Sequence, residues 1–315
     1  MEQLLRDKAK ELLESGQADV VIGYEAGSVP FKSTPLYAKS PEDAERLVWN
    51  PTCVNNLAVY LPQAAKTGKV AVVVKPCDGK SVVELLKEHQ ITRENVRTIV
   101  VPCPGVLNLD ALAEIDLADV RSVEWTNDGI KVTTGSGDVS IPKDKAFLDK
   151  CLSCTLGDPA VADIKIGEQP ARASIVDPKT SVEEYEKMSP AERRAFWGKH
   201  FENCIRCYAC RQACPACYCN ECFTDKLGQM WITRSTDPTT NWFFHMTRAM
   251  HLAGRCIGCG ECERACPMNI PLSLLGKKLE MDVADMFGDS PGQDPEALPI
   301  LGSWKAEDPD PCPEE

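Results

Sequence analysis

Eight cysteines of this chain fall into two runs with the same spacing. Residues 204–215 read CIRCYACRQACP, and residues 256–267 read CIGCGECERACP. In a C-x₂-C-x₂-C-x₃-C-P run, the first three thiolates can bind three corners of one iron–sulfur cubane, and the fourth points to the other cluster. The spacing therefore predicts two [4Fe-4S] clusters. The first thiol set is Cys204, Cys207, Cys210 and Cys266, and the second thiol set is Cys256, Cys259, Cys262 and Cys214.

Zinc is the main alternative for so many thiols. A structural zinc site usually takes two cysteine pairs separated by a longer loop, whereas here each short run holds four cysteines. The runs resemble the bacterial-type ferredoxin domain with two [4Fe-4S] clusters, which implies an α+β domain. Residues 215–255 separate the runs by more chain than a compact ferredoxin uses, so we expect an insertion that covers one cluster or docks a partner. Its aromatic stretch, residues 242–246, is expected in a core or a partner contact.

The two runs differ beside their cysteines. Arg206 and Tyr208 stand where the second run has Gly258 and Gly260. Backbone amides approach cluster sulfurs more freely beside glycine, and such hydrogen bonds help to set reduction potentials. We therefore expect two clusters of unequal potential.

Three loop cysteines, Cys217, Cys219 and Cys222, directly follow the first run. Cysteines so close together favour a ligand role, and they could join Cys53 or another cysteine of the N-terminal half in a further, fourth cluster. The alternative is a group of buried thiols without a metal, because free cysteine is often buried. Cys312, near the end of the chain, is expected to be a free thiol.

Another four cysteines lie in the N-terminal half. Cys77 and Cys103 each follow a short run of β-branched residues, and Cys151 and Cys154 form a later pair. The carboxyl ends of parallel strands line one edge of a sheet, so we expect these four sheet-edge cysteines to meet there and to be able to bind a third [4Fe-4S] cluster. Lys75 could steady an anionic cofactor at this edge, although a solvated lysine is the simpler interpretation.

Three motifs surround the sheet-edge cysteines: KPCD at 75–78, PCPG at 102–105 and CLSCTLGDPAVADIKIG at 151–167. Together they are similar to motifs of the β subunits of deazaflavin-reducing hydrogenases and deazaflavin-dependent formate dehydrogenases, over roughly residues 45–170. The resemblance implies an FAD-binding domain with an adjacent cluster. With its ferredoxin runs placed last, the chain is also similar to iron–sulfur subunits of sulfhydrogenases and of heterodisulfide-reductase-linked oxidoreductases.

Alternating strands and helices are expected to position the N-terminal cysteines. Apolar spacing predicts strands over 18–25, 69–74 and 96–102 and helices over 1–15, 41–50, 53–68 and 81–90, an order typical of a parallel sheet. Residues 127–129 read Asn-Asp-Gly, which favours a hairpin turn.

The composition shifts toward cysteine, proline and charged residues after residue 151. We therefore expect an α/β domain over 1–180, an α+β two-[4Fe-4S] ferredoxin domain over 181–285, and an acidic, proline-rich tail over 286–315.

Seventeen cysteines and a net charge of −12 narrow the class of protein. The first residues lack the apolar core of a secretory signal, and structural disulfides are rare in the reducing cytoplasm. Acidic charge would repel nucleic acid and anionic lipid, and no apolar run reaches the about 20 residues that span a bilayer. We expect a cytoplasmic protein that binds no nucleic acid and does not insert into a membrane. Structural roles are expected for the scattered histidines His89, His200, His245 and His251.

These features favour an electron-transfer subunit of an anaerobic oxidoreductase complex. A flavin or hydride-handling partner would exchange electrons with a catalytic subunit such as heterodisulfide reductase, hydrogenase or formate dehydrogenase. Flavin handles two electrons and iron one, so joining them connects hydride chemistry to single-electron transfer. The alternatives are a relay and docking subunit without flavin, and a deazaflavin or NAD(P)H dehydrogenase.

Overall fold

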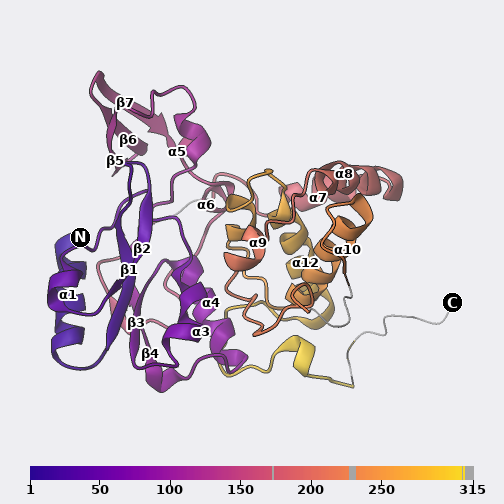
Figure 1. Ribbon diagram of the computed structural model, residues 1–315, viewed down its shortest axis with the longest axis horizontal. Helices are drawn as coiled ribbons and strands as arrows, with labels where there is room; N and C mark the ends of the chain where they lie inside the picture. The colour runs from indigo at the N-terminus through magenta and orange to yellow at the C-terminus, as the bar shows by residue number, and fades with distance from the viewer. Residues whose placement is uncertain (172–173, 227–231, 307, 309–315) are drawn as a thin grey trace. The chain divides into compact units, whose positions relative to one another are not determined.

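The computed structural model describes residues 1–171, 174–226, 232–306 and 308 (Figure 1). The chain forms two compact units, one of Met1–Val82 with Ile91–Pro178 and one of Val83–Gln90 with Lys179–Glu315. The mixed α/β character expected from the sequence is confirmed. The domain limits expected at 1–180, 181–285 and 286–315 stay predictions.

A five-stranded sheet lies at the centre of the first unit. Its order is β2-β1-β3-β4-β8, with β2 antiparallel to β1 and the other neighbours parallel. The central strands are valine- and isoleucine-rich and buried on both faces, as is typical of a parallel sheet covered by helices. The three expected strands are confirmed, and two edge strands are added. The bounds are β1 (Val20–Ala26), β2 (Ser33–Ala38), β3 (Val70–Val74), β4 (Val96–Val100) and β8 (Ile164–Lys165).

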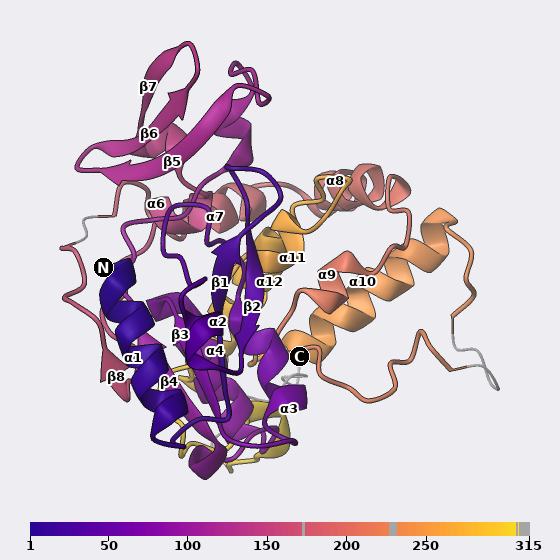
Figure 2. The same ribbon diagram turned by 60° about the vertical axis from the view of Figure 1, so that its left-hand side comes forward.

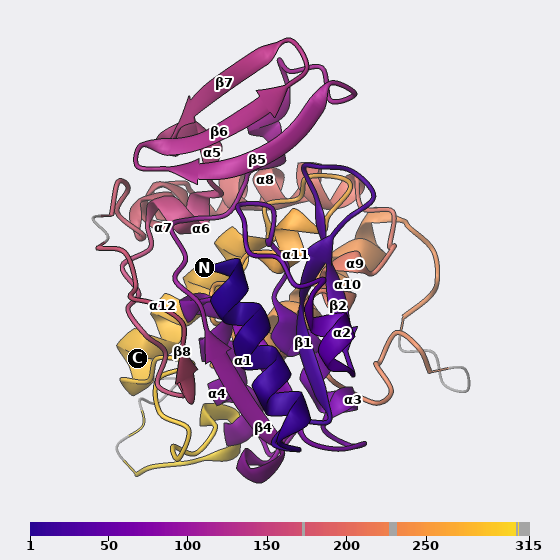
Figure 3. The same cartoon turned by 90° about the vertical axis from the view of Figure 1, so that its left-hand side faces the viewer.

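Helices α1 (Glu2–Glu14) and α4 (Pro76–Lys87) lie on opposite faces of this sheet (Figures 1 and 3). Helix α1 buries Leu5, Ala9 and Leu12, which recur at helical spacing on one face. Helix α4 begins earlier than its apolar pattern predicts, because proline suits the first turn of a helix. Cys77 therefore lies in the first turn of α4.

The helices expected over 41–50 and 53–68 are wrong in extent. The structure instead has α2 (Pro41–Ala44), the 3₁₀ turn η1 (Leu57–Tyr60) and α3 (Leu61–Ala64). The Asn56 side chain caps η1 by accepting the Ala58 N–H, and Pro62 has no N–H with which to continue a helix from the preceding turn. Caps and proline thus divide a segment whose apolar spacing indicated two longer helices.

A separate three-stranded antiparallel sheet, β5-β6-β7, also belongs to the first unit (Figure 2). The expected hairpin is confirmed, since Thr126 pairs with Gly129 across the Asn127-Asp128 turn. The third strand was not expected. The sheet packs on Leu107, Leu112 and Phe147. The bounds here are β5 (Val120–Thr126), β6 (Gly129–Thr134), β7 (Gly137–Pro142), α5 (Lys143–Ala146), α6 (Asp149–Leu152), η2 (Arg93–Asn95) and η3 (Leu109–Leu112).

The second unit is helical, with no strand among its described residues. The strands of the expected α+β ferredoxin fold are therefore not found there, because long helices with strong caps flank the cysteine runs. Helix α8 starts with a capping box between Ser189 and Glu192, and α10 starts at the Asp237 cap and Pro238. The bounds are α7 (Thr180–Glu186), α8 (Pro190–Glu202), α9 (Ala209–Gln212), α10 (Pro238–Leu252), α11 (Glu261–Arg264), α12 (Leu272–Phe287) and η4 (Ile300–Gly302).

An aromatic core joins α8 to α10 in this unit. Phe201 stacks on Trp197 at a centroid distance of 5.2 Å and on His245 at 4.4 Å. The Asn241 side chain, fully buried, donates to the carbonyls of Phe201 and Cys204 at 2.9 Å each. Helix α10 is thereby fixed against the loop that starts the first cysteine run. None of the helices in the described residues is long and apolar enough to cross a membrane.

Candidate metal centres

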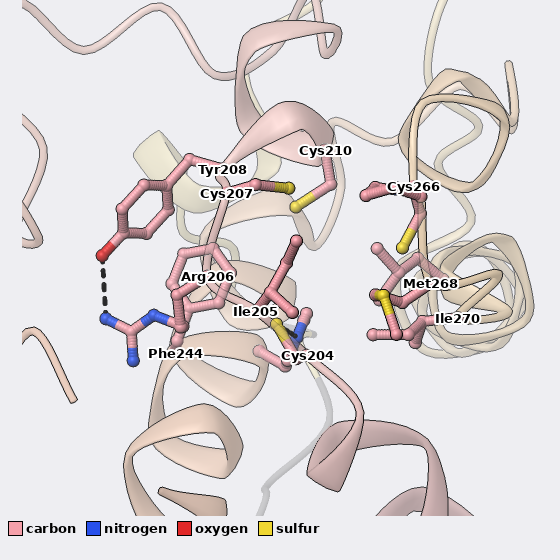
Figure 4. A pocket seen from close by; sticks show the side chains of 13 residues that line it. Cys204, Ile205, Arg206, Cys207, Tyr208, Cys210, Phe244, Cys266, Met268 and Ile270 are labelled. Atoms are coloured by element: carbon pink, nitrogen blue, oxygen red, sulfur yellow. Dashed lines mark hydrogen bonds between the residues drawn. The ribbon is translucent and has the colours of Figure 1, made fainter. Parts of the chain in front are cut away.

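The four cysteines of the first thiol set line one pocket of the second unit. Figure 4 shows Cys204, Cys207, Cys210 and Cys266 directed into the same space, three from the first run and one from the second. The rest of the lining is mainly apolar, and α10 contributes Phe244 and His245. The crossed grouping expected from the spacing is thus present in space for this set. Its role as a ligand set stays a prediction.

Both runs have the same backbone conformation at matching positions. Gly258 and Gly260 have φ values of 67° and 66°, and Arg206 and Tyr208 have 55° and 61°. Left-handed residues within a turn direct successive N–H groups inward, and such concave sites bind anions, iron–sulfur clusters among them. The conformation, with four thiols around one pocket, fits a [4Fe-4S] cluster.

Local contacts hold Arg206 and Tyr208 in a conformation that favours glycine. The Arg206 side chain is 6% exposed and donates to Tyr208 Oη at 2.9 Å and to the Thr240 carbonyl at 3.2 Å. Its guanidinium also lies 5.0 Å from the Phe244 ring centroid. The first run therefore uses side-chain contacts to α10 where the second run uses glycine, and the two sites are chemically unequal.

The second thiol set is also brought together. Burial raises the pKa of Cys256 to about 12, with further contributions from the Cys259 and Cys214 thiolates against a hydrogen bond from the Gly258 backbone. Burial also raises the pKa of Cys262, and nearby Cys214, Cys256 and Cys259 raise it further against Arg248. Helix α12 leaves room for the set, because a Cβ at Gly276 would lie 2.9 Å from Cys256 Sγ. Thiols with raised pKa values lose their protons only when a metal replaces them.

No mononuclear metal site is found among the described residues. Within these ranges, no group of three or more cysteine, histidine, aspartate or glutamate side chains is placed to bind one metal ion. A four-iron cubane occupies more space than one ion, so this finding concerns single ions alone.

Sequence reasoning missed the role of two polar side chains on α10. His245 Nε2 lies 3.3 Å from Cys204 Sγ, and burial, with the charges of Arg248 and Arg206, lowers the pKa of His245 to about 3. A neutral imidazole can donate this N–H to the sulfur. Arg248 is 7% exposed, and its Nη2 donates to the Cys210 carbonyl at 3.0 Å. Their three-residue spacing on α10 places both on one face, but the sequence did not indicate that this face meets the cysteines.

Arg248 lies close to both thiol sets. Burial alone would lower its pKa, but the thiolates of Cys214, Cys262, Cys217 and Cys210 outweigh burial and raise it. The side chain is therefore a permanent cation beside members of both sets.

The sheet-edge cysteines follow the strands as expected. Strands β3 and β4 are parallel, with Val74 opposite Val100, so Cys77 and Cys103 leave the sheet at the same edge. Burial raises the pKa of Cys77 well above its usual value, and the Asp78 and Cys103 charges add to the effect against Lys150 and Lys75. Helix α6, with Cys151, is tied to this edge where the Leu148 N–H bonds the Val106 carbonyl at 3.1 Å. Cys154 follows α6, and a cluster held by the four stays a prediction.

The interpretation of Lys75 as a solvated side chain is wrong. Lys75 is 1% exposed, and its Nζ lies 2.7 Å from Tyr24 Oη, 2.8 Å from the Asn55 carbonyl and 2.7 Å from Asp78 Oδ2. Burial alone would lower the pKa of Lys75, but the Asp78 charge outweighs burial and holds it above the usual range. A charged pair is therefore buried beside Cys77, where the sequence pattern around a strand end gave no sign of a partner.

The ADIKIG sequence at 162–167 has a structural role. Asp163 accepts the Thr98 N–H at 2.7 Å and pairs with Arg93, and the next residues form β8 beside β4. Burial would raise the pKa of Asp163, but these partners lower it below the usual value. Gly167 has φ of 77°, which suits glycine. The motif fixes the last strand of the sheet.

The remaining cysteines are divided between the units. Cys53, fully buried in the first unit, donates its thiol to the Val48 carbonyl at 3.7 Å. The loop cysteines line a cavity of the second unit. A cluster that joins them to Cys53 stays a prediction, and Cys312 lies outside the described residues.

Two family descriptions match this chain. Residues 67–189 match the C terminus of the beta subunit of coenzyme F420 hydrogenase/dehydrogenase, and residues 203–271 match the 4Fe-4S dicluster domain. The first match contains all four sheet-edge cysteines, and the second contains both cysteine runs. The resemblance expected from the sequence is confirmed.

Curated relatives match along nearly the whole chain. The chain is 24% identical to the F420-dependent formate dehydrogenase subunit beta of Methanocaldococcus jannaschii, over 93% of this chain and 92% of that protein. It is 26% identical to the F420-dependent formate dehydrogenase 1 subunit beta of Methanococcus maripaludis, over 93% and 91%. Each alignment therefore runs through both matched segments.

One solved structure matches part of the chain. A chain of the F420-reducing [NiFe] hydrogenase complex from Methanosarcina barkeri, a xenon derivative, is 22% identical with a TM-score of 0.38. The match covers 49% of this chain and 62% of that chain.

Proposed function

Because this chain joins a coenzyme F420 hydrogenase/dehydrogenase beta-subunit domain to a 4Fe-4S dicluster domain, we propose that it is the iron–sulfur electron-transfer subunit of an F420-dependent formate dehydrogenase or hydrogenase complex. The single observation that carries the proposal is the grouping of four thiols from two distant runs around one pocket. Such a grouping is typical of a two-cluster ferredoxin module. The named relatives are beta subunits of F420-dependent enzymes, which supports the choice of complex.

The residues proposed to hold the clusters are the two thiol sets. Bound [4Fe-4S] clusters would supply one-electron carriers. The chain's own residues exclude water, provide inward N–H groups at the left-handed turns and place a histidine donor beside Cys204. We also assign to the segment between the runs the role of an insertion that covers the first site, since α10 lies in it and contributes Phe244 and His245 to the pocket.

The first unit is proposed to bind FAD and a third [4Fe-4S] cluster at the sheet-edge cysteines. Deazaflavin F420 exchanges a hydride, which carries two electrons, whereas an iron–sulfur cluster accepts one, so a flavin between them would divide the pair. The support is that Cys77 and Cys103 leave parallel strands at one edge and that α6 is tied to it. The competing function is a relay and docking subunit without flavin. Extraction of anaerobically purified protein separates the two, because released FAD is expected only from the first.

The proposed partners are the other subunits of such a complex, with heterodisulfide reductase as a further acceptor, in an anaerobic cytoplasm. The test uses the complex purified through this chain without oxygen. Addition of formate or hydrogen should bleach the visible absorption of the clusters, and oxidised F420 should restore it. A chain that purifies with neither activity, or whose absorption ignores both additions, would refute the proposal. Turnover by the isolated chain would instead favour a self-sufficient dehydrogenase.

A further inference from the structure

The second unit contains a cavity that the two thiol sets do not account for. Its volume is about 450 Å³, and the loop cysteines Cys217, Cys219 and Cys222 all line it together with His251 of α10. None of these three thiols belongs to a ferredoxin run. The share of one water molecule in the liquid is about 30 Å³, so the cavity is large enough for a polynuclear group.

The cavity continues directly from the second thiol set. The Cys217 N–H bonds the Cys214 carbonyl at 3.1 Å, and the side chains of these two cysteines are hydrogen-bonded to each other. His251 lies on the same helix as Arg248, one turn further on. One chain segment and one helix therefore bring four soft or borderline donors to one space next to a predicted cluster.

Positive charge surrounds the same space. Arg211, Arg248 and Arg255 line the cavity, while Asp225, the carboxylate in its lining, is paired with Arg211 at 2.8 Å. Arg248 is more than nine-tenths buried, and its Nε has no hydrogen-bond partner among the described residues. A buried donor without an acceptor is costly. The lining therefore calls for an anionic occupant.

We propose that Cys217, Cys219, Cys222 and His251 bind a further [4Fe-4S] cluster in this cavity. Thiolates select iron–sulfur clusters and other soft metal centres, and imidazole can replace cysteine as a cluster ligand. A cubane with three thiolates carries net negative charge, which the arginines balance and which gives the free Nε of Arg248 an acceptor. The assignment replaces the expected partnership with Cys53, because His251 already lies in the lining.

The test compares iron content and EPR spectra of the full chain purified without oxygen. Cys219→Ser and Cys222→Ser are the test variants, and Glu221→Gln is the matched control, since Glu221 is exposed in the same loop. Each test variant should lose about four irons per chain, one cubane, while the signals of the two ferredoxin clusters remain and report that the module is folded. The control should keep its iron. His251→Ala should change the EPR signal that the cysteine variants lose and no other.

Unchanged iron content in both cysteine variants would overturn the proposal, and so would zinc in place of the lost iron. An unchanged spectrum in His251→Ala would overturn the assignment of the fourth ligand. The outcome is separable from that of the proposed function. If the wild-type chain contains fewer than about eight irons, the ferredoxin module itself fails, whereas full module signals without loss in Cys219→Ser refute this site alone.

Discussion

Replacement of Arg248 by methionine should make the reduction potentials of both ferredoxin clusters more negative. The guanidinium is buried, stays charged, and lies close to Cys210 of the first thiol set and to Cys214 and Cys262 of the second. Reduction adds an electron to a cluster, so a nearby cation favours the reduced form. Methionine keeps much of the side-chain length and removes the charge.

The size of the effect follows from Coulomb's law. At an effective dielectric constant of about 20, a unit charge about 8 Å from a cluster centre contributes roughly 2 kcal/mol. A factor of ten corresponds to about 59 mV and 1.4 kcal/mol for one electron, so the expected shift is on the order of 90 mV for each cluster. The Cys210 carbonyl also loses a donor at 3.0 Å, which costs about 1–3 kcal/mol of folding stability.

The assay is an EPR-monitored redox titration of the chain purified without oxygen. Arg248→Lys keeps the charge and should shift the potentials far less than Arg248→Met. Arg255→Met is a second control, because Arg255 is paired with Glu88 and Tyr218. Potentials that stay unchanged in Arg248→Met, or that fall equally in Arg248→Lys, would refute the reasoning.

Three further predictions follow from other buried groups. His245→Leu removes the contact to Cys204 Sγ and should lower the potential of one cluster only, by roughly 50 mV if the hydrogen bond contributes about 1 kcal/mol; equal shifts in the same titration would contradict this. Lys75→Met leaves the Asp78 charge buried without its cation and should cost about 3–5 kcal/mol in urea unfolding. A Lys75→Met/Asp78→Leu double variant should recover much of that loss, and a double variant as unstable as the single would count against the ion pair. Asp163 has a pKa below its ordinary 3.8, so its stabilisation is complete above pH 3.8 and is lost as the pH falls through the lowered value. Asp163→Asn should therefore be less stable than the wild type at neutral pH and show a weaker loss of stability below pH 3.8; parallel acid unfolding curves would refute this.

Short-range spacing predicted the cysteine sites well. Four cysteines in one run constrain where their thiols can lie, and the fourth cysteine of each run is carried away from its own cluster. The first pocket shows this grouping. The parallel pairing of β3 and β4 likewise followed from two β-branched runs of similar length.

The rest depended on contacts between distant segments. A helix pattern identifies the face that holds His245 and Arg248, but not that this face meets the first cysteine run. Lysine is rarely buried without a partner, and the partners of Lys75 come from three separate segments. Turn residues divided the expected helices at Pro62, which apolar spacing alone does not weigh.

The crossed ligand sets can be tested most directly by comparing the EPR spectra of three reduced variants, Cys204→Ser, Cys266→Ser and Cys256→Ser. Cys204 and Cys266 belong to different runs but line one pocket, so their variants should lose the same cluster signal and keep the same residual spectrum, while Cys256→Ser should lose the other. Matching losses in Cys266→Ser and Cys256→Ser, or a wild-type chain without any cluster signal, would contradict the account.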